Sequence, residues 1–296
     1  MTDTTNDLPG LPEPPAIGAT ALPPGTYDGE TVIVTGAGTG LGKAIASEFA
    51  RLGAKVAVLS RKPEHLEAAQ TDIGALTEVL TVPCDIRDPE AIAAAIDAVE
   101  ERFGLPRVLV NNAAANFPVS AEDMSPNAWR TVVDITLNGT FFMSREFARR
   151  HLAVGSPASI IDIGATYAWT GGPGFAHSAA AKAGVKNMVE TLAVEWGPYG
   201  IQVNGLVPGL FPHEDMTADI KGNLARTDDK DVCQPAMRVG RLRELGWAAT
   251  FLASPYAQFI SGHTLVVDGA NWQRRNLTRE PMVTVRQQMG KGPFSL

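Results

Sequence analysis

Three side chains able to handle protons lie within the stretch TYAWTGGPGFAHSAAAKAG, residues 166–184. Tyr167 lies fifteen residues before Lys182, and Ser178 lies four residues before it. The spacing of four places Ser178 and Lys182 one helical turn apart. A tyrosine phenol, with an ordinary pKa of about 10, can act as a general acid, whereas a serine hydroxyl is a much weaker acid. The stretch therefore indicates a proton-transfer site, although a solitary tyrosine is also often a packing or loop-anchor residue.

A glycine-rich segment, TGAGTGLG (35–42), follows the apolar run TVIVTG (31–36) and opens the helical pattern KAIASEFARLG (43–53). Gly36, Gly40 and Gly42 let the backbone turn tightly and approach a pyrophosphate, which the helix N-terminus then stabilises. A purely structural glycine turn is the alternative. We predict a dinucleotide site here, formed by Gly36, Thr39, Gly40, Leu41 and Gly42.

The end of the second predicted strand indicates which dinucleotide binds. An NAD site usually carries an acidic residue about 20 residues beyond the glycines. That place reads Ser60-Arg61-Lys62, which offers no carboxylate to a ribose 2′-hydroxyl. Arg61 and Lys62 can instead meet a 2′-phosphate, and arginine can do so with two parallel hydrogen bonds. We predict NADPH as the cofactor; the alternative is that both cations are solvated loop residues.

Strand and helix patterns alternate along the chain. Strands are expected over 31–36, 55–60, 78–85, 107–112, 158–164, 201–209 and 263–269, and helices over 43–53, 63–73, 88–104, 125–152, 177–197 and 243–254. This alternation predicts an α/β fold of one domain: a Rossmann-like, doubly wound parallel sheet of about seven strands with helices on both faces. Ligands bind such sheets beyond the carboxyl ends of the strands, near the switch in strand order.

Three regions are expected along the chain. A proline-rich, extended N-terminal arm covers 1–28 and could lie on a neighbouring subunit; a catalytic domain covers 29–271, with a substrate lid over about 210–240; and a C-terminal tail covers 272–296. The long, mixed segment after Pro208 is what suggests the lid.

Composition limits which classes of partner and which cellular compartment are expected. The 296 residues are 45% hydrophobic and 19% charged, with a net charge of −7, which fits a soluble globular protein and disfavours nucleic acid or an anionic membrane as a partner. No apolar run approaches the roughly 20 residues that span a bilayer. The two cysteines imply no disulfide framework. The first 30 residues lack the basic residues of secretory or transit peptides, and the final residues are FSL rather than SKL, so the cytoplasm is expected.

Five features in this order resemble the short-chain dehydrogenase/reductase family over about residues 29–271. They are TGAGTGLG, Asp85 after the third strand, NNAA (111–114) after the fourth, Lys182 on a helix, and VPG (207–209) after the sixth strand. The resemblance implies that Asp85 contacts the adenine, that Asn112 lies along the cofactor and that Lys182 holds the nicotinamide ribose. It also implies a homo-oligomer, commonly a tetramer, and a carboxamide contact by Pro208, Gly209 and Leu210.

One departure from the family pattern changes the expected reaction. Ketone and alcohol enzymes of the family carry a tyrosine four residues before the lysine and a serine thirteen residues before that tyrosine. Here Ser178 and Ala165 occupy those positions. The pattern therefore argues against ordinary carbonyl reduction, and it admits a catalytically inactive member of the family.

A resemblance to one subgroup of the family favours an active enzyme over an inactive member. The segments NNAAANF (111–117), SPNAW (125–129), SRK (60–62) and CDIRDP (84–89) resemble the NADPH-dependent 2,4-dienoyl-CoA reductases. In that subgroup the active tyrosine lies in the loop after the fifth strand, where Tyr167 is expected. The subgroup's NNAAGNF asparagine falls on Asn116, with Ala115 in place of the glycine. The resemblance thus implies a catalytic set of Tyr167, Asn116, Ser178 and Lys182.

The chemistry of a 2,4-dienoyl thioester explains why the catalytic tyrosine would lie at a different position than in the ketone enzymes of the family. Hydride arrives at C5, and the negative charge runs through the conjugated system to the distant thioester oxygen. Tyr167 and Asn116 could stabilise that dienolate, each donor contributing roughly 3–4 kcal/mol. Lys182 would hold the ribose and favour a more acidic Tyr167, and Ser178 would orient the lysine or the thioester.

The predicted substrate is therefore an acyl-CoA in unsaturated fatty-acid β-oxidation. The residues expected to bind it are Asn116, Phe117 and Arg87; the lid cations Lys221, Arg226, Arg238 and Arg241 could meet CoA phosphates or be solvated. Adjacent His213, Glu214 and Asp215 lack the spacing of metal ligands, so no metal is predicted. The alternatives are a trans-2-enoyl-CoA or other short-chain reductase, or a non-catalytic NADPH-binding scaffold.

Overall fold

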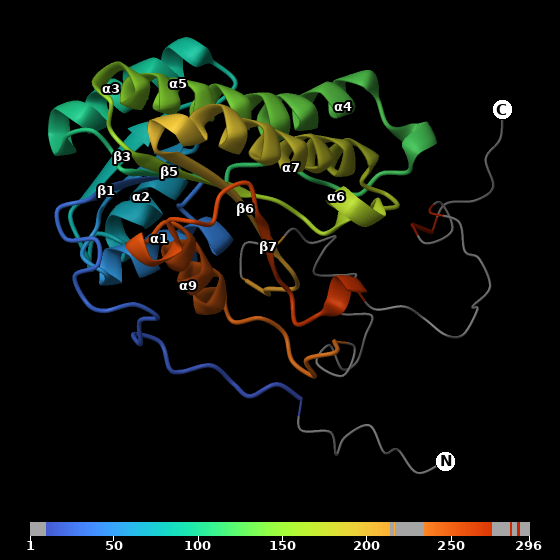
Figure 1. Cartoon of the computed structure of the whole chain (residues 1–296). Helices are drawn as coiled ribbons and strands as arrows, with labels where there is room; N and C mark the ends of the chain where they lie inside the picture. Colours follow the sequence, from blue (N-terminus) through green and yellow to red (C-terminus); the bar gives the residue numbers. More distant parts are fainter. Residues whose placement is uncertain (1–9, 214–215, 217–233, 274–284, 286–288, 291–296) are drawn as a thin grey trace.

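The computed structural model describes residues 10–213, 216, 234–273, 285 and 289–290. Within these residues seven strands form one parallel sheet in the order β3-β2-β1-β4-β5-β6-β7 (Figure 1). Their bounds are β1 Thr31–Thr35, β2 Lys55–Ser60, β3 Val79–Pro83, β4 Val108–Asn111, β5 Ala158–Ile163, β6 Ile201–Pro208 and β7 Thr264–Val267. The strand order reverses between β1 and β4, which places a binding crevice at their carboxyl ends. The predicted Rossmann-like fold is confirmed.

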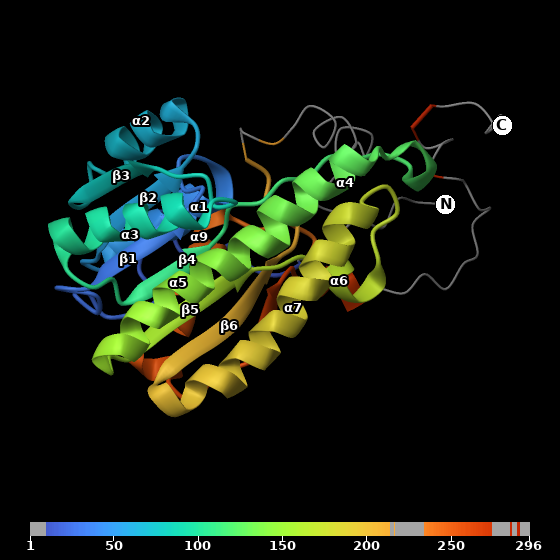
Figure 2. The same cartoon turned by 90° about the horizontal axis from the view of Figure 1, so that it is seen from above.

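Helices cover both faces of this sheet (Figures 1 and 2). One face packs against α1 (Gly40–Arg51), α2 (Pro63–Asp72) and α9 (Leu242–Leu252), and the other against α3 (Pro89–Phe103), α5 (Gly139–Val154) and α7 (Ala176–Trp196). The inner strands are short apolar runs whose side chains are buried on both faces, as a sheet between two helical layers requires, whereas the edge strands β3 and β7 are only partly buried. All the predicted strands and helices are present, with ends shifted by a few residues.

The long helix expected over 125–152 is divided. It begins as α4 (Pro126–Val133), capped by the Ser125 hydroxyl, which accepts a hydrogen bond of 3.1 Å from the Ala128 N–H. A π-helical turn, η3 (Asp134–Asn138), then leads into α5. Figure 2 shows α4 and α5 following one another along the top of the sheet. Single π-turns within α-helices are often found at functional sites.

Two hydrophobic clusters, one on each side of the sheet, fix the strand ends in space. Phe49 of α1 and Leu245 of α9 are fully buried in one cluster, and Phe147 of α5 and Val189 of α7 are buried in the other. Each large apolar side chain contributes about 1.5–3 kcal/mol when it is removed from water. The loops beyond the strands are therefore carried on a rigid support.

The described part of the N-terminal arm lies on its own chain. Leu11 N–H donates to the Ala236 carbonyl at 2.9 Å, and the Trp247 indole N–H donates to the Ala19 carbonyl at 3.0 Å. Further contacts follow the arm along α9, among them the 2.6 Å hydrogen bond from the Tyr27 hydroxyl to the Thr250 carbonyl. These contacts show an extended arm bound to α9 and to the segment just before it. No helix in the described ranges is long and apolar enough to cross a bilayer.

Candidate functional site

A cavity of about 500 Å³ lies beyond the carboxyl ends of β1, β2 and β4, at the switch in strand order. Ser60, Cys84 and Ile86 form part of its wall, and Asn116 and His213 lie at it as well. The residues predicted to bind the cofactor that line this cavity are Gly36, Thr39, Gly40, Leu41, Gly42, Arg61, Lys62 and Asn112.

The glycine loop packs closely against Asn112 at one end of the cavity. Gly36 has a φ of +67°, and a Cβ on Gly42 would lie 2.4 Å from Asn112 Nδ2 and 2.6 Å from the Gly36 carbonyl oxygen. Asn112 holds the loop by donating to the carbonyls of Thr35 at 3.0 Å and Gly36 at 3.1 Å. The loop then opens α1, whose N-terminal N–H groups attract an anion. This backbone fits the pyrophosphate of a dinucleotide.

The charge at the other end of the cavity is positive. Arg61 and Lys62 line it, and none of the described lining residues is acidic. Asp85 is held beside this end by Arg87, whose Nε donates at 3.0 Å, and lies 3.7 Å from Arg61 Nη1. The hydrogen bonds from Arg87 lower the pKa of the Asp85 carboxyl. A 2′-phosphate therefore fits this end, and Arg87, predicted as a CoA contact, is engaged with Asp85.

Three of the predicted catalytic side chains come together. Tyr167 begins α6 (Tyr167–Thr170), a one-turn helix beside the N-terminal end of α7 (Figure 2). Its hydroxyl lies 2.9 Å from Ser178 Oγ, and Asn116 Nδ2 donates to it at 3.4 Å. Because Asn116 also lines the large cavity, this cluster borders the cofactor groove. Phe117, the predicted substrate contact, lies with its ring edge-on to His177 at 4.7 Å.

Burial dominates the acidity of the tyrosine. It raises the pKa of Tyr167 above the ordinary value of a phenol, and the hydrogen bond with Ser178 lowers it by less. The expectation of a more acidic Tyr167 is therefore not met by the surroundings that the structure describes. In these surroundings Tyr167 is a neutral hydrogen-bond donor over the physiological pH range, as an oxyanion site requires.

Lys182 lies behind this cluster on the buried face of α7. Its ammonium donates to the carbonyl of Ile163, at the carboxyl end of β5. Burial lowers the pKa of Lys182 to about 8, and the neighbouring carboxyl of Asp162 opposes that shift. Asp162 is itself fully buried, which raises its pKa to about 7, and its Oδ1 accepts a 2.8 Å hydrogen bond from Asn111.

The sequence reading missed Asp162. The available signal was a carboxylate inside the otherwise apolar run ASIIDIG, where a buried strand is predicted and an ionisable residue is costly. His213, for which the sequence suggests only a metal-ligand role, also lies at the cofactor cavity. The structure places its ring over the glycine loop, where a Cβ on Gly40 would lie 2.9 Å from its Cε1.

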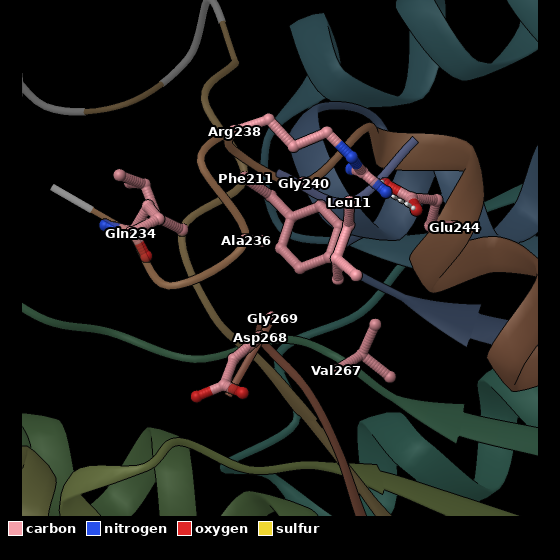
Figure 3. A pocket seen from close by; sticks show the side chains of 11 residues that line it. Leu11, Phe211, Gln234, Ala236, Arg238, Gly240, Glu244, Val267, Asp268 and Gly269 are labelled. Atoms are coloured by element: carbon pink, nitrogen blue, oxygen red, sulfur yellow. Dashed lines mark hydrogen bonds and ion pairs between the residues drawn. The ribbon is translucent and has the colours of Figure 1, made fainter. Parts of the chain in front are cut away.

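The substrate side is described only at the two ends of the predicted lid. Beyond Pro208, the last residue of β6, and Gly209, Leu210 borders a second cavity of about 100 Å³, together with Phe211 and Gly240 (Figure 3). Arg238 pairs with Glu244 at 2.7 Å beside this cavity, and Arg241 pairs with Glu13 of the arm. These two cations are thus engaged within the chain. The predictions for Glu214, Asp215, Lys221 and Arg226 lie outside the described residues.

A parallel sheet with a glycine cradle at its switch point, and an adjoining tyrosine–asparagine–serine cluster, define a dinucleotide-dependent oxidoreductase. The model of the family described as enoyl-(acyl carrier protein) reductase matches residues 36–270. The chain belongs to the short-chain dehydrogenase/reductase family.

Relatives are similar over most of their length. A probable 2,4-dienoyl-CoA reductase [(2E)-enoyl-CoA-producing] of Bacillus subtilis is 39% identical over 82% of this chain and 96% of its own. The peroxisomal 2,4-dienoyl-CoA reductase [(3E)-enoyl-CoA-producing] of Rattus norvegicus is 38% identical, covering 84% and 86%. A solved short chain dehydrogenase from Bacillus anthracis has a TM-score of 0.74 and 38% identity, covering 86% and 99%.

Proposed function

We propose that this protein is an NADPH-dependent 2,4-dienoyl-CoA reductase of unsaturated fatty-acid β-oxidation. The observation that carries the proposal is the position of Tyr167. Its hydroxyl contacts Ser178 and Asn116 from the start of α6, in the connection after β5, while Ser178 occupies the helix position one turn before Lys182. The relatives named 2,4-dienoyl-CoA reductases support the same assignment.

The residues of the large cavity support NADPH as the cofactor. The cradle around Gly36 and Gly42 would hold the pyrophosphate, and Arg61 and Lys62 would meet the 2′-phosphate. Lys182 would hold the nicotinamide ribose. When bound, NADPH supplies the hydride that adds to C5 of the dienoyl group.

Tyr167 and Asn116 serve as the hydrogen-bond donors of the reaction. Negative charge that develops at the thioester oxygen is stabilised by the phenol and the side-chain amide, each worth roughly 3–4 kcal/mol when preorganised. Ser178 keeps the Tyr167 hydroxyl in place. Water protonates the dienolate, so that one hydride and one proton complete the reduction to an enoyl-CoA.

Several finer features belong to the proposal. Asn116 and Phe117 would contact the acyl chain, and Arg87 a CoA phosphate. Asp85 would contact the adenine, and Pro208, Gly209 and Leu210 the carboxamide end of the cofactor. A cytoplasmic location and a homotetramer remain predictions, and relatives of this chain include proteins named peroxisomal.

The test is NADPH consumption measured side by side with a 2,4-dienoyl-CoA, a 2-enoyl-CoA and a 3-ketoacyl-CoA. We expect the dienoyl thioester to be reduced fastest and Tyr167→Phe to lose at least about 100-fold in kcat. Tyr256→Phe, at an exposed tyrosine, is the matched control. Faster turnover of the enoyl-CoA would favour the alternative reductase, and NADPH binding without any turnover would favour a scaffold.

A further inference from the structure

A row of polar side chains crosses the sheet at one level. Asn111 pairs with Asp162, Asp162 with Gly205, and Gly205 with Thr264, on β4, β5, β6 and β7 in turn. Directly paired residues point to the same face of a sheet, so the three polar side chains and the one glycine share a face. This face is the one covered by α5 and α7, because Asn111 also donates to Ser144 of α5 at 2.9 Å.

Three side-chain atoms of this row, Asn111 Oδ1, Asp162 Oδ2 and Thr264 Oγ1, have no hydrogen-bond partner among the described residues. Asp162 Oδ1 accepts from Asn111, but Asp162 Oδ2 and Thr264 Oγ1 are buried and make no hydrogen bond to any residue that the structure describes. Buried polar atoms are almost always paired, either with protein or with ordered water. Leaving one unpaired costs about 1–3 kcal/mol, and more for a charged group. The row therefore requires an additional polar ligand.

A space for such a ligand borders Asp162 and Thr264, the residues that carry two of these atoms. Asp162, Gly205, Thr264 and Lys182 line a small cavity. The centre of a water molecule can occupy about 10 Å³ of it. Gly205 creates it, because a Cβ at that position would lie 2.7 Å from Thr264 Oγ1. A buried water needs about 10–15 Å³ by this measure and two to four polar partners. The space therefore matches one water molecule.

We propose that Asp162 and Thr264 hold one buried water molecule beside Lys182, and that Asp162 is a positioning residue that keeps Lys182 protonated. The Thr264 hydroxyl donates to the water, and the water donates to Asp162 Oδ2. The ammonium of Lys182 then has a carboxylate and a water dipole on its buried side and the carbonyl of Ile163 at the strand end. The inference rests on the proposed function only for the role of Lys182 at the cofactor.

No other described charged group near Lys182 can take the role of keeping it protonated. From α7, Lys186 also lines the small cavity, but its ammonium pairs with Glu190 at 2.5 Å and lies over the ring of Trp169. The side chains that face the row from β4 and α5 are the neutral Asn111 and Ser144. Tyr167 is the titratable group of the adjoining cluster. Among the described residues, Asp162 is the carboxylate whose charge acts on Lys182.

The first experiment measures the pKa of Lys182 directly, by NMR of labelled lysine side chains in the cofactor-free protein. Asp162→Asn keeps an oxygen that can accept from Asn111 but removes the charge, so we expect the pKa of Lys182 to fall by about one unit or more. Thr264→Val should lower it in the same direction by less. Glu190→Gln, which removes a carboxylate from the outer lysine, is the matched control and should leave it unchanged. An unchanged pKa of Lys182 in Asp162→Asn would overturn the proposal.

A crystal structure that resolves ordered waters tests the other half. We expect one water within hydrogen-bond distance of both Asp162 Oδ2 and Thr264 Oγ1, and its loss in Thr264→Val; a dry cavity in the unaltered protein overturns the water site. Thr264→Val also tests the proposal if Asp162→Asn fails to fold. Neither experiment uses turnover, so a failed dienoyl-CoA assay and a failed Lys182 measurement are distinguishable.

Discussion

The hydroxyl of Tyr167 is subject to two opposing effects. Burial disfavours the phenolate, whereas the hydrogen bond with Ser178 stabilises it, and burial is the larger of the two. A neutral phenol held by a serine and an asparagine can donate to a developing oxyanion without first changing its charge state. Ser178 therefore matters for where the donor points and for how readily it gives its proton.

Ser178→Ala tests this arrangement at a single oxygen. The pKa of Tyr167 should rise further, because the one contact that lowers it is lost. A hydrogen bond of about 1 kcal/mol corresponds to a roughly five- to tenfold loss, which we expect in kcat/KM for a dienoyl-CoA. Ser47→Ala is the control, since the Ser47 hydroxyl only donates to the Lys43 carbonyl within α1. Equal kcat/KM values for both variants would show that Ser178 does not act through Tyr167.

Arg61→Ala tests the cofactor preference. Hydrogen bonds to a charged group contribute about 1.5–3 kcal/mol, so the Kd for NADPH should rise by roughly 10- to 100-fold while the Kd for NADH stays the same. Fluorescence titration with both nucleotides measures this without substrate. Arg102→Ala is the control, because Arg102 pairs with Glu78 and does not line the cavity. Equal losses for the two nucleotides would contradict a 2′-phosphate contact.

The positions of the predicted cofactor residues follow more directly from the sequence than the surroundings of Lys182 do. The glycines and Arg61 follow strands directly, so their place at the sheet edge follows from the alternation of elements. Asp162 was not predicted, because its importance depends on which residues of β4, β6 and β7 stand beside it. Strand register is a tertiary property that a local pattern does not contain.

At the level of elements, the π-turn between α4 and α5 positions the asparagine of the site. Thr136 lies in this turn, and its hydroxyl accepts from Ala115 N–H at 3.3 Å and lies 3.4 Å from the Ala115 carbonyl. Ala115 immediately precedes Asn116. The periodic pattern of 125–152 predicted one helix, because five residues of wider winding change the apolar periodicity little. The four-residue α6 was missed because a helix this short depends on tertiary contacts.

Thr136→Val should therefore reduce catalysis through Asn116. The substitution removes the partner of the partly buried N–H of Ala115, so we expect the free energy of unfolding to fall by about 1 kcal/mol. A displaced donor should also lower kcat by roughly tenfold or more. Thr140→Val is a close control: Thr140 is buried in the first turn of α5, and its hydroxyl donates to the Thr136 carbonyl. If both variants keep full kcat, the turn does not position the site.

At the level of the whole molecule, the buried carboxyl of Asp162 in the polar row of the sheet links the stability of the fold to pH. Burial raises the pKa of Asp162 to about 7 in the folded protein, against about 4 in an unfolded chain. The folded state therefore binds the proton more tightly. The stabilisation that this gives is complete below about pH 4 and is lost as the pH rises through 7.

Asp162→Asn removes this titration and keeps the shape of the side chain. Between pH 5 and pH 7 the unaltered protein should lose about 2 kcal/mol of unfolding free energy relative to the variant, by the linkage between protonation and folding. Urea denaturation at pH 5 and at pH 7 measures the difference. Both values lie below the pKa of Lys182, so Lys182 stays mostly protonated in the unaltered protein. Asp97→Asn, at an exposed aspartate of α3, is the matched control. A difference between Asp162→Asn and the unaltered protein that stays constant with pH would mean that Asp162 is already ionised at pH 5, and that the charge of Lys182 is compensated there as well.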